Sequence, residues 1–267
     1  MYHEENNGVE STMQKLFTTL RHIPTRLTVL GTVVVLFSLA LLPASAMAAS
    51  SANAPQKCGA TDVKCVITFG DQRIKERQDA LNTLSSKVKA QREKNHITED
   101  QAEALQTDIK TNLDGLADLK SKLDGEQDAQ AARTDIKNVY STLRIFAVVL
   151  PRDYRRLHLD LEINLRDKLA DRQTRIERLI DKASADKQTQ LNPLFADYKA
   201  QLSGSEGQID TVQTTLPKLT PASYNNDRAT YDANLAQIKQ SEDALQKSLK
   251  QAASDLHQIV QLLKKKA

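Results

Sequence analysis

The 267-residue sequence contains no tryptophan, and aromatic residues make up only 4% of it. So few aromatic side chains argue against the stacking platforms that bind single-stranded nucleic acid or sugars. Eight glycines and seven prolines are also few for this length, which favours long regular elements over loops. Alternating runs of β-branched residues are missing after residue 50, while Ala, Leu, Gln, Lys and Glu abound, so helices are expected.

The charge of the chain is nearly balanced, with 37 basic and 34 acidic residues and a net charge of +3. Three lysines at the carboxyl end, residues 264–266, account for this excess. A broad basic surface for DNA or RNA is therefore not expected, and nucleic acid is not a predicted partner. A hydrophobic content of 40% nevertheless suffices for a folded core, so disorder of the whole chain is not expected.

Motifs of common enzymes are missing as well: the sequence has no Gly-rich phosphate loop, no H-E-x-x-H and no G-x-S-x-G. His158 and Glu162 share one helical face and could form half of a metal site, but two ligands from one helix are insufficient. An ion pair on a helix surface is the favoured interpretation. We expect a non-enzymatic protein with no metal and no cofactor.

The first fifty residues resemble an export signal in their order of parts. Residues 1–26 carry Arg21 and Arg26, and residues 27–48 begin with the uncharged run "LTVLGTVVVLFSLALL" and end in small residues. Cleavage between Ala48 and Ala49 fits a signal peptide. The same stretch could instead remain as a single membrane anchor with the body outside, and the membrane would then be a partner. Either alternative predicts an extracytoplasmic protein, secreted or attached to the cell membrane.

The only two cysteines, Cys58 and Cys65, lie in a linker of residues 49–66 with the spacing C-x6-C. In an oxidising compartment an isolated pair of this kind predicts a disulfide. We expect it to fasten the start of the first helix. A metal site with two thiolates is the alternative, but further ligands are lacking nearby.

The domain of residues 67–267 is dominated by apolar positions that alternate in steps of three and four. A spacing that averages 3.5 residues keeps one stripe of a helix against a partner helix in a coiled coil. We therefore predict an all-α fold, an elongated antiparallel helical bundle or coiled coil of about six helices. The expected helices span residues 67–94, 98–123, 126–150, 152–187, 191–216 and 221–264.

Several local signals set these boundaries. Thr98 and Gln101 form a capping-box pattern, and Gly125 is a typical helix stop. The prolines after residue 57 are expected between helices or in first turns. Pro151 either turns the chain back into a new helix or kinks one long helix, and "SGSEG" at 203–207 could break the fifth helix.

The segment "RIFAVVLPRDYRR" at residues 144–156 combines an apolar run with three arginines. Its residues of interest are Ile145, Phe146, Val148, Val149, Leu150, Arg152, Arg155 and Arg156. The favoured interpretation is a crowded place where three or more helices meet, because the run is apolar on every side. The alternatives are a tip that contacts anionic membrane lipids and a pocket for an apolar ligand.

The stretches "HITEDQAEALQTDIKTNLDGLADLKSKL" and "RIFAVVLPRDYRRL" resemble segments of uncharacterised secreted bacterial coiled-coil proteins. This resemblance covers about a third of the chain and implies export and an all-helical structure. It implies no catalytic or binding residue.

Two functions are compatible with these features. The first is an exported, non-enzymatic scaffold, spacer or protein-binding stalk of the cell envelope, which uses helix surfaces to bind itself or a protein partner. The second is a soluble extracytoplasmic carrier that binds an apolar ligand or lipid within the bundle.

Overall fold

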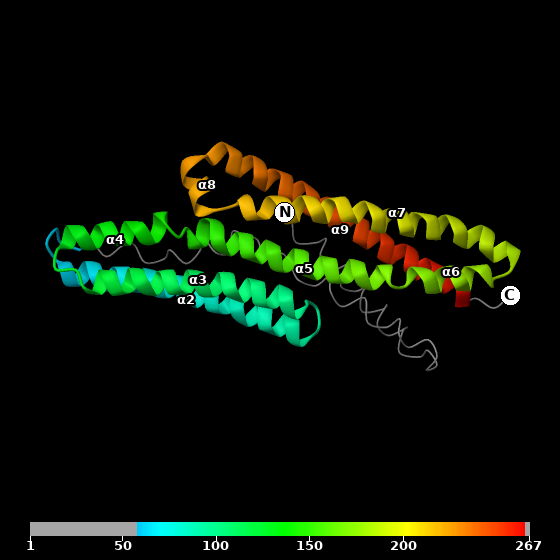
Figure 1. Cartoon of the computed structure of the whole chain (residues 1–267), viewed down its shortest axis with the longest axis horizontal. Coiled ribbons are helices and arrows are strands. Elements are labelled where there is room, and N and C mark those ends of the chain that lie inside the picture. The colour runs from blue at the N-terminus through cyan, green and yellow to red at the C-terminus, as the bar shows by residue number, and fades with distance from the viewer. Residues whose placement is uncertain (1–57, 265–267) are drawn as a thin grey trace, which may run out of the picture. The chain divides into compact units, whose positions relative to one another are not determined.

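The protein is described by a computed structural model over residues 58–264, and every regular element in that range is helical (Figure 1). The predicted all-α fold is confirmed. The expected export segments, residues 1–26 and 27–48, and the residues Ala48 and Ala49 lie outside the described residues. The helices are α2 (Val63–Glu93), α3 (Glu99–Asp124), α4 (Ala129–Ser141), the π-helix η4 (Ile145–Val149), α5 (Leu150–Ala170), α6 (Gln173–Asp181), α7 (Ala185–Thr215), the 3-10 helix η5 (Leu216–Lys218), α8 (Pro221–Asn226) and α9 (Arg228–Lys264).

One group of helices consists of α2, α3 and α4, each of which contacts the other two. The predicted capping box is present at the start of α3, where the side chain of Thr98 accepts from the backbone N–H of Gln101 and the Gln101 side chain accepts from the Thr98 N–H. The predicted apolar stripe of α3 is the part that is buried. Its buried members are Ala102, Leu105, Ile109, Leu116 and Leu123.

A second group is formed by α7 and α9, which pack along much of their length. The apolar stripes predicted for both helices form this contact, and Phe195, Tyr198, Leu202, Leu245 and Leu249 are buried in it. At about 1.5 Å per residue, the 37 residues of α9 extend roughly 55 Å. The "SGSEG" segment does not break α7, whose helix continues through residues 203–207.

Helix α5 lies between the two groups and contacts α2, α3, α7 and α9 (Figure 1). For this reason its buried residues do not form a single stripe. Leu157, Leu159 and Leu161 are all buried, although they point to different sides of the helix. The expectation that this region is enclosed by several helices is confirmed for α5.

The predicted helices 126–150 and 152–187 are wrong in their boundaries. The break lies at Arg144, which has a left-handed backbone with φ of 47°, and the helix then continues from Ile145 through Pro151. Pro151 is tolerated because it lies in the first turn of α5, where a missing N–H costs little. Pro193 was expected outside helices or in a first turn, but it lies within α7. A further break after Ala170 separates α5 from α6.

Candidate functional site

The amino-terminal end of the described chain is closed by a disulfide between Cys58 and Cys65, whose Cα atoms are 5.6 Å apart. The predicted disulfide is confirmed, and it fastens the first turn of α2 as expected. Asp62 caps the same turn, because its carboxylate accepts a 3.0 Å hydrogen bond from the Cys65 N–H. A disulfide is typical of proteins that reside in an oxidising compartment.

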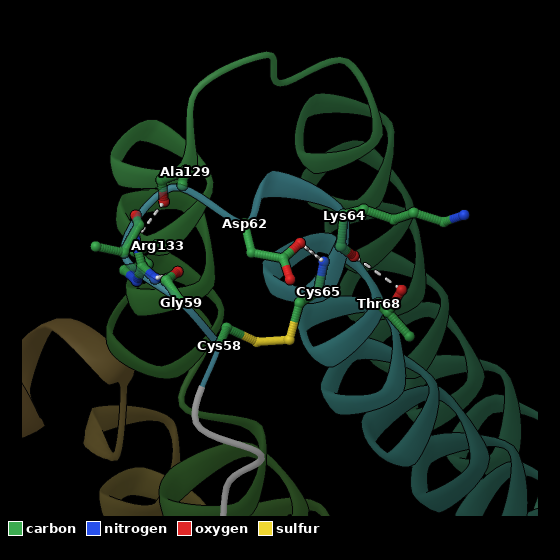
Figure 2. Close-up of a disulfide and its surroundings, with 9 residues drawn as sticks. Cys58, Gly59, Asp62, Lys64, Cys65, Thr68, Ala129 and Arg133 are labelled. Carbon is green, nitrogen blue, oxygen red and sulfur yellow. Dashed lines mark hydrogen bonds between the residues drawn. A yellow bond between two sulfur atoms is a disulfide. The ribbon is translucent and has the colours of Figure 1, made fainter.

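The disulfide loop, residues 58–65, is also held from outside by Arg133 of α4 (Figure 2). The guanidinium donates two hydrogen bonds of 2.7 Å, one to the carbonyl of Gly59 and one to the carbonyl of Ala60. Two distant parts of the sequence therefore meet here: the disulfide loop at the start of α2, and α4. Nothing in the sequence around Arg133 indicates this contact, because its partners are backbone atoms more than 70 residues away.

The apolar run before Pro151 is buried except for Phe146 and Ala147. Ile145, Val148, Val149 and Leu150 are at most 2% exposed, whereas Phe146 is 39% exposed. The expectation that the run is enclosed on every side is therefore wrong for Phe146. The physical reason is the break at Arg144, which rotates the following residues about the helix axis. Phe146 therefore does not continue the buried face of α4.

The exposed Phe146 ring contacts the guanidinium of Arg77, which lies 4.9 Å from the ring centroid. The ring of Tyr140 contacts the same guanidinium at 4.4 Å. Arg77 of α2 is itself only 5% exposed, so its charge lies beneath two aromatic rings, that of Tyr140 from α4 and that of Phe146 from η4. Contacts of this kind are favourable by about 1 kcal/mol each.

The left-handed residue Arg144 is held by α8. Its Nε donates to the side-chain oxygen of Asn225 at 2.8 Å, and the amide nitrogen of Asn225 donates to the Ser141 carbonyl at 2.7 Å. The Arg144 guanidinium also lies over the ring of Tyr224. These contacts stabilise a backbone conformation that residues other than glycine rarely adopt.

The three arginines after Pro151 make ion pairs within the fold. Arg152 contacts Asp153 at 2.8 Å, Arg156 contacts Asp108 of α3 at 2.9 Å, and Arg155 contacts Glu242 of α9. The last two pairs join α5 to a helix of each group. The sequence offered these three arginines as possible contacts for anionic head groups. In the structure each of them pairs with a carboxylate of the fold.

Helix α5 buries three carboxyl groups, those of Asp153, Asp160 and Glu162. Burial raises the pKa of Asp153 despite the neighbouring Arg152, and it raises the pKa of Asp160 to about 6. Burial, assisted by the charge of Glu242, raises the pKa of Glu162 to about 8. At neutral pH, Glu162 therefore keeps its proton.

The prediction that His158 and Glu162 form an ion pair on the helix surface is wrong, because Glu162 is buried, with only 6% of it exposed. The two side chains are close, with 3.6 Å between His158 Nδ1 and Glu162 Oε2. Burial lowers the pKa of His158 as it raises that of Glu162, so both groups are neutral at pH 7.

Within residues 58–264, no group of three or more His, Cys, Asp or Glu side chains is arranged to hold a metal ion. No helix in the same range is both long and apolar enough to span a bilayer. An open groove between α2 and α3 is lined mainly by polar side chains, which include Asp71, Lys75, Asp79 and Lys120.

In comparisons with protein-family models, with curated proteins and with solved structures, nothing matches this chain.

Proposed function

We propose that the protein is an exported, non-enzymatic helical protein that serves as a scaffold, spacer or protein-binding stalk of the cell envelope. The observation that carries this proposal is the Cys58–Cys65 disulfide at the amino-terminal end of the helical body. A disulfide in this place favours an oxidising compartment, and it directly follows the sequence pattern of an export segment.

The body behind this disulfide supports a structural role. Two of its longest helices, α7 and α9, pack against each other through mainly apolar stripes, and this packing gives a stiff element tens of ångströms long. The charged side chains of α5 are engaged between helices, as the pairs of Arg155 with Glu242 and Arg156 with Asp108 illustrate. Such contacts fix helix positions, which is what a spacer requires.

Helix surfaces would supply the partner contacts. The rings of Tyr140 and Phe146 are exposed and are held in place by Arg77, and Tyr and Arg are residue types enriched at protein interfaces. Self-association or binding of a protein partner is the expected use of such a surface. The carrier alternative gains no comparable support, because the apolar run that would bind the ligand is largely buried in the core.

The proposal is tested by the intact mass of the native protein, measured separately from culture medium and from washed membranes. A species that begins at Ala49 in the medium, lighter than its reduced form by two hydrogens, would support secretion with the disulfide formed. A full-length oxidised species in membranes would support an anchored stalk. A full-length reduced species in the cytosol would contradict export and the function proposed from it.

The structural role itself is tested by sedimentation of the purified protein. Concentration-dependent self-association, weakened by Tyr140→Ala and Phe146→Ala with unchanged helicity, is the expected result. Lys110→Ala, at an exposed position of α3, is the matched control. Co-purification of a stoichiometric lipid instead would favour the carrier.

A further inference from the structure

The contact between α5 and α9 contains two acidic side chains, Glu162 of α5 and Glu242 of α9. Glu162 is 6% exposed and the side chain of Glu242 is 15% exposed. One oxygen of each, Glu162 Oε2 and Glu242 Oε1, is buried without a hydrogen-bond partner. A buried ionised oxygen without a partner is costly, so this contact does not accommodate both groups in their charged form.

The charges around the two carboxyl groups do not balance when both are ionised. Arg155 of α5 pairs with Glu242, and on α9 the charges of Lys239 and Asp243 act on Glu242 in opposite directions. His158 contacts Glu162 but is neutral at pH 7 because its pKa is lowered. Two cations therefore face three acidic groups, and the contact is neutral only while one carboxyl keeps its proton.

The other elements packed on α5 supply no further cation to this contact in the described part of the chain. Charged groups on those helices are engaged with other residues of α5: Asp108 of α3 with Arg156, Glu206 of α7 with Arg166, and Lys87 of α2 with the ring of Tyr154. The π-helix η4 carries only apolar residues. Among residues 58–264, the charge that acts on Glu162 is therefore the acidic one of Glu242, with no cation to offset it when Glu162 loses its proton.

We propose that the α5–α9 contact is a proton-dependent latch, closed while one proton remains on the Glu162–Glu242 pair and opened when that proton is lost to solvent. Loss of the proton leaves two carboxylates in one interface, and this releases α5 from α9. The packing of α2 with α3 and α4 does not involve this pair, so that group stays intact. The protein thereby gains a pH-controlled opening of the contact between α5 and α9, while α5 stays joined to α7.

The pH range of the latch follows from the sign of the shift. Burial raises the pKa of Glu162 from its ordinary value of 4.5 to about 8 in the closed form. Opening exposes the carboxyl group to solvent and returns its pKa to the ordinary value. The closed form is therefore most stable below about pH 4.5, loses stability as the pH rises, and loses no more above about pH 8. Between pH 6 and pH 8 the opening equilibrium constant is expected to increase about fiftyfold.

Hydrogen–deuterium exchange of the native protein tests this proposal. Wild type and Glu162→Gln are compared at the same pH, because the intrinsic exchange rate of an amide depends on pH and then cancels between the two proteins. Glutamine has the shape of the protonated carboxyl but cannot ionise. The expected result is a loss of wild-type protection in α5 and in the facing part of α9 between pH 6 and pH 8, absent in E162Q. Protection in α2 and α3 should be the same in both proteins. Glu206→Gln, which removes the carboxylate of the exposed Arg166 pair, is the matched control and should behave as wild type.

Equal pH dependence in wild type and E162Q would overturn the proposal, as would a loss of protection that includes α2 and α3 equally. Should E162Q fail to fold, Glu242→Gln serves as the second variant. It removes the repelling charge and frees Arg155 for Glu162, so the change should be smaller than fiftyfold, although burial still raises the pKa of Glu162. An unchanged response in E242Q would count against the latch.

Discussion

Gly70 of α2 lies in close contact with Leu123 of α3 and Ile136 of α4, and its replacement by alanine is expected to destabilise the protein. A Cβ atom at this position would lie 2.8 Å from Ile136 Cγ1 and closer still to Leu123 Cδ2. Leu123 is fully buried and Ile136 is 8% exposed, so neither side chain has free space to move into. Overpacking of this kind costs about 1–3 kcal/mol.

The same substitution also has a favourable component, because alanine is about 1 kcal/mol better than glycine in a helix interior. We therefore expect the free energy of unfolding of Gly70→Ala to fall by roughly 1 kcal/mol. Gly204 and Gly207 of α7 are matched controls, since an added Cβ at either position meets nothing within 4 Å. Gly204→Ala and Gly207→Ala should each gain about 0.5–1 kcal/mol.

Urea unfolding with the disulfide intact measures all three variants. Adding Ile136→Val to Gly70→Ala should recover only a small part of the loss, because it removes the Ile136 Cδ1 atom at 3.1 Å from the added Cβ but keeps Cγ1 at 2.8 Å. The reasoning fails if Gly70→Ala is stabilised to the same degree as Gly204→Ala. That result would mean that the helices around Gly70 separate easily, and that their close approach contributes little to stability.

Three further outcomes are expected from the same unfolding assay. Replacing Cys58 and Cys65 together by serine should lower the free energy of unfolding by roughly 2 kcal/mol, because the loop they close is short. The raised pKa of Asp160 makes its ionised form unfavourable in the fold, so the wild type should lose at most about 3 kcal/mol of stability as the pH rises from about 4 to about 6. Asp160→Asn should remove this loss, and unfolding at pH 4 and at pH 7 measures it. Thr98→Ala should cost about 1 kcal/mol through loss of the α3 capping box, and an unchanged value would show that the Gln101 half of the box suffices.

The helices that could be predicted well are those whose signals are local. For α3, a capping box and a regular apolar stripe lie within the helix itself, and its predicted bounds of 98–123 differ from Glu99–Asp124 by one residue at each end. The break at Arg144 could not be predicted in this way. Its left-handed conformation is stabilised by Asn225, which lies 81 residues away, and no glycine marks the position.

The same distinction applies to the candidate site. The disulfide was predictable because the chain has only two cysteines, whereas the Arg133 contacts with backbone carbonyls leave no pattern in the sequence. The buried carboxyls of α5 resembled surface charges because arginines surround them. One signal was nevertheless present: Asp153 and Asp160 flank Leu157 in steps of four and three, the spacing of a buried stripe. Polar residues in such a stripe indicate a polar helix contact.

The disulfide loop also determines how mechanical force would enter the molecule. A pull on the chain ahead of Cys58 would be transmitted through the sulfur–sulfur bond directly to Cys65 in the first turn of α2, and the intervening residues 59–64 would not be stretched. Arg133 would pass part of the tension sideways to α4 through its two hydrogen bonds. Two helices would then share the strain at the point of attachment, so α2 would not be unwound from its end one turn at a time.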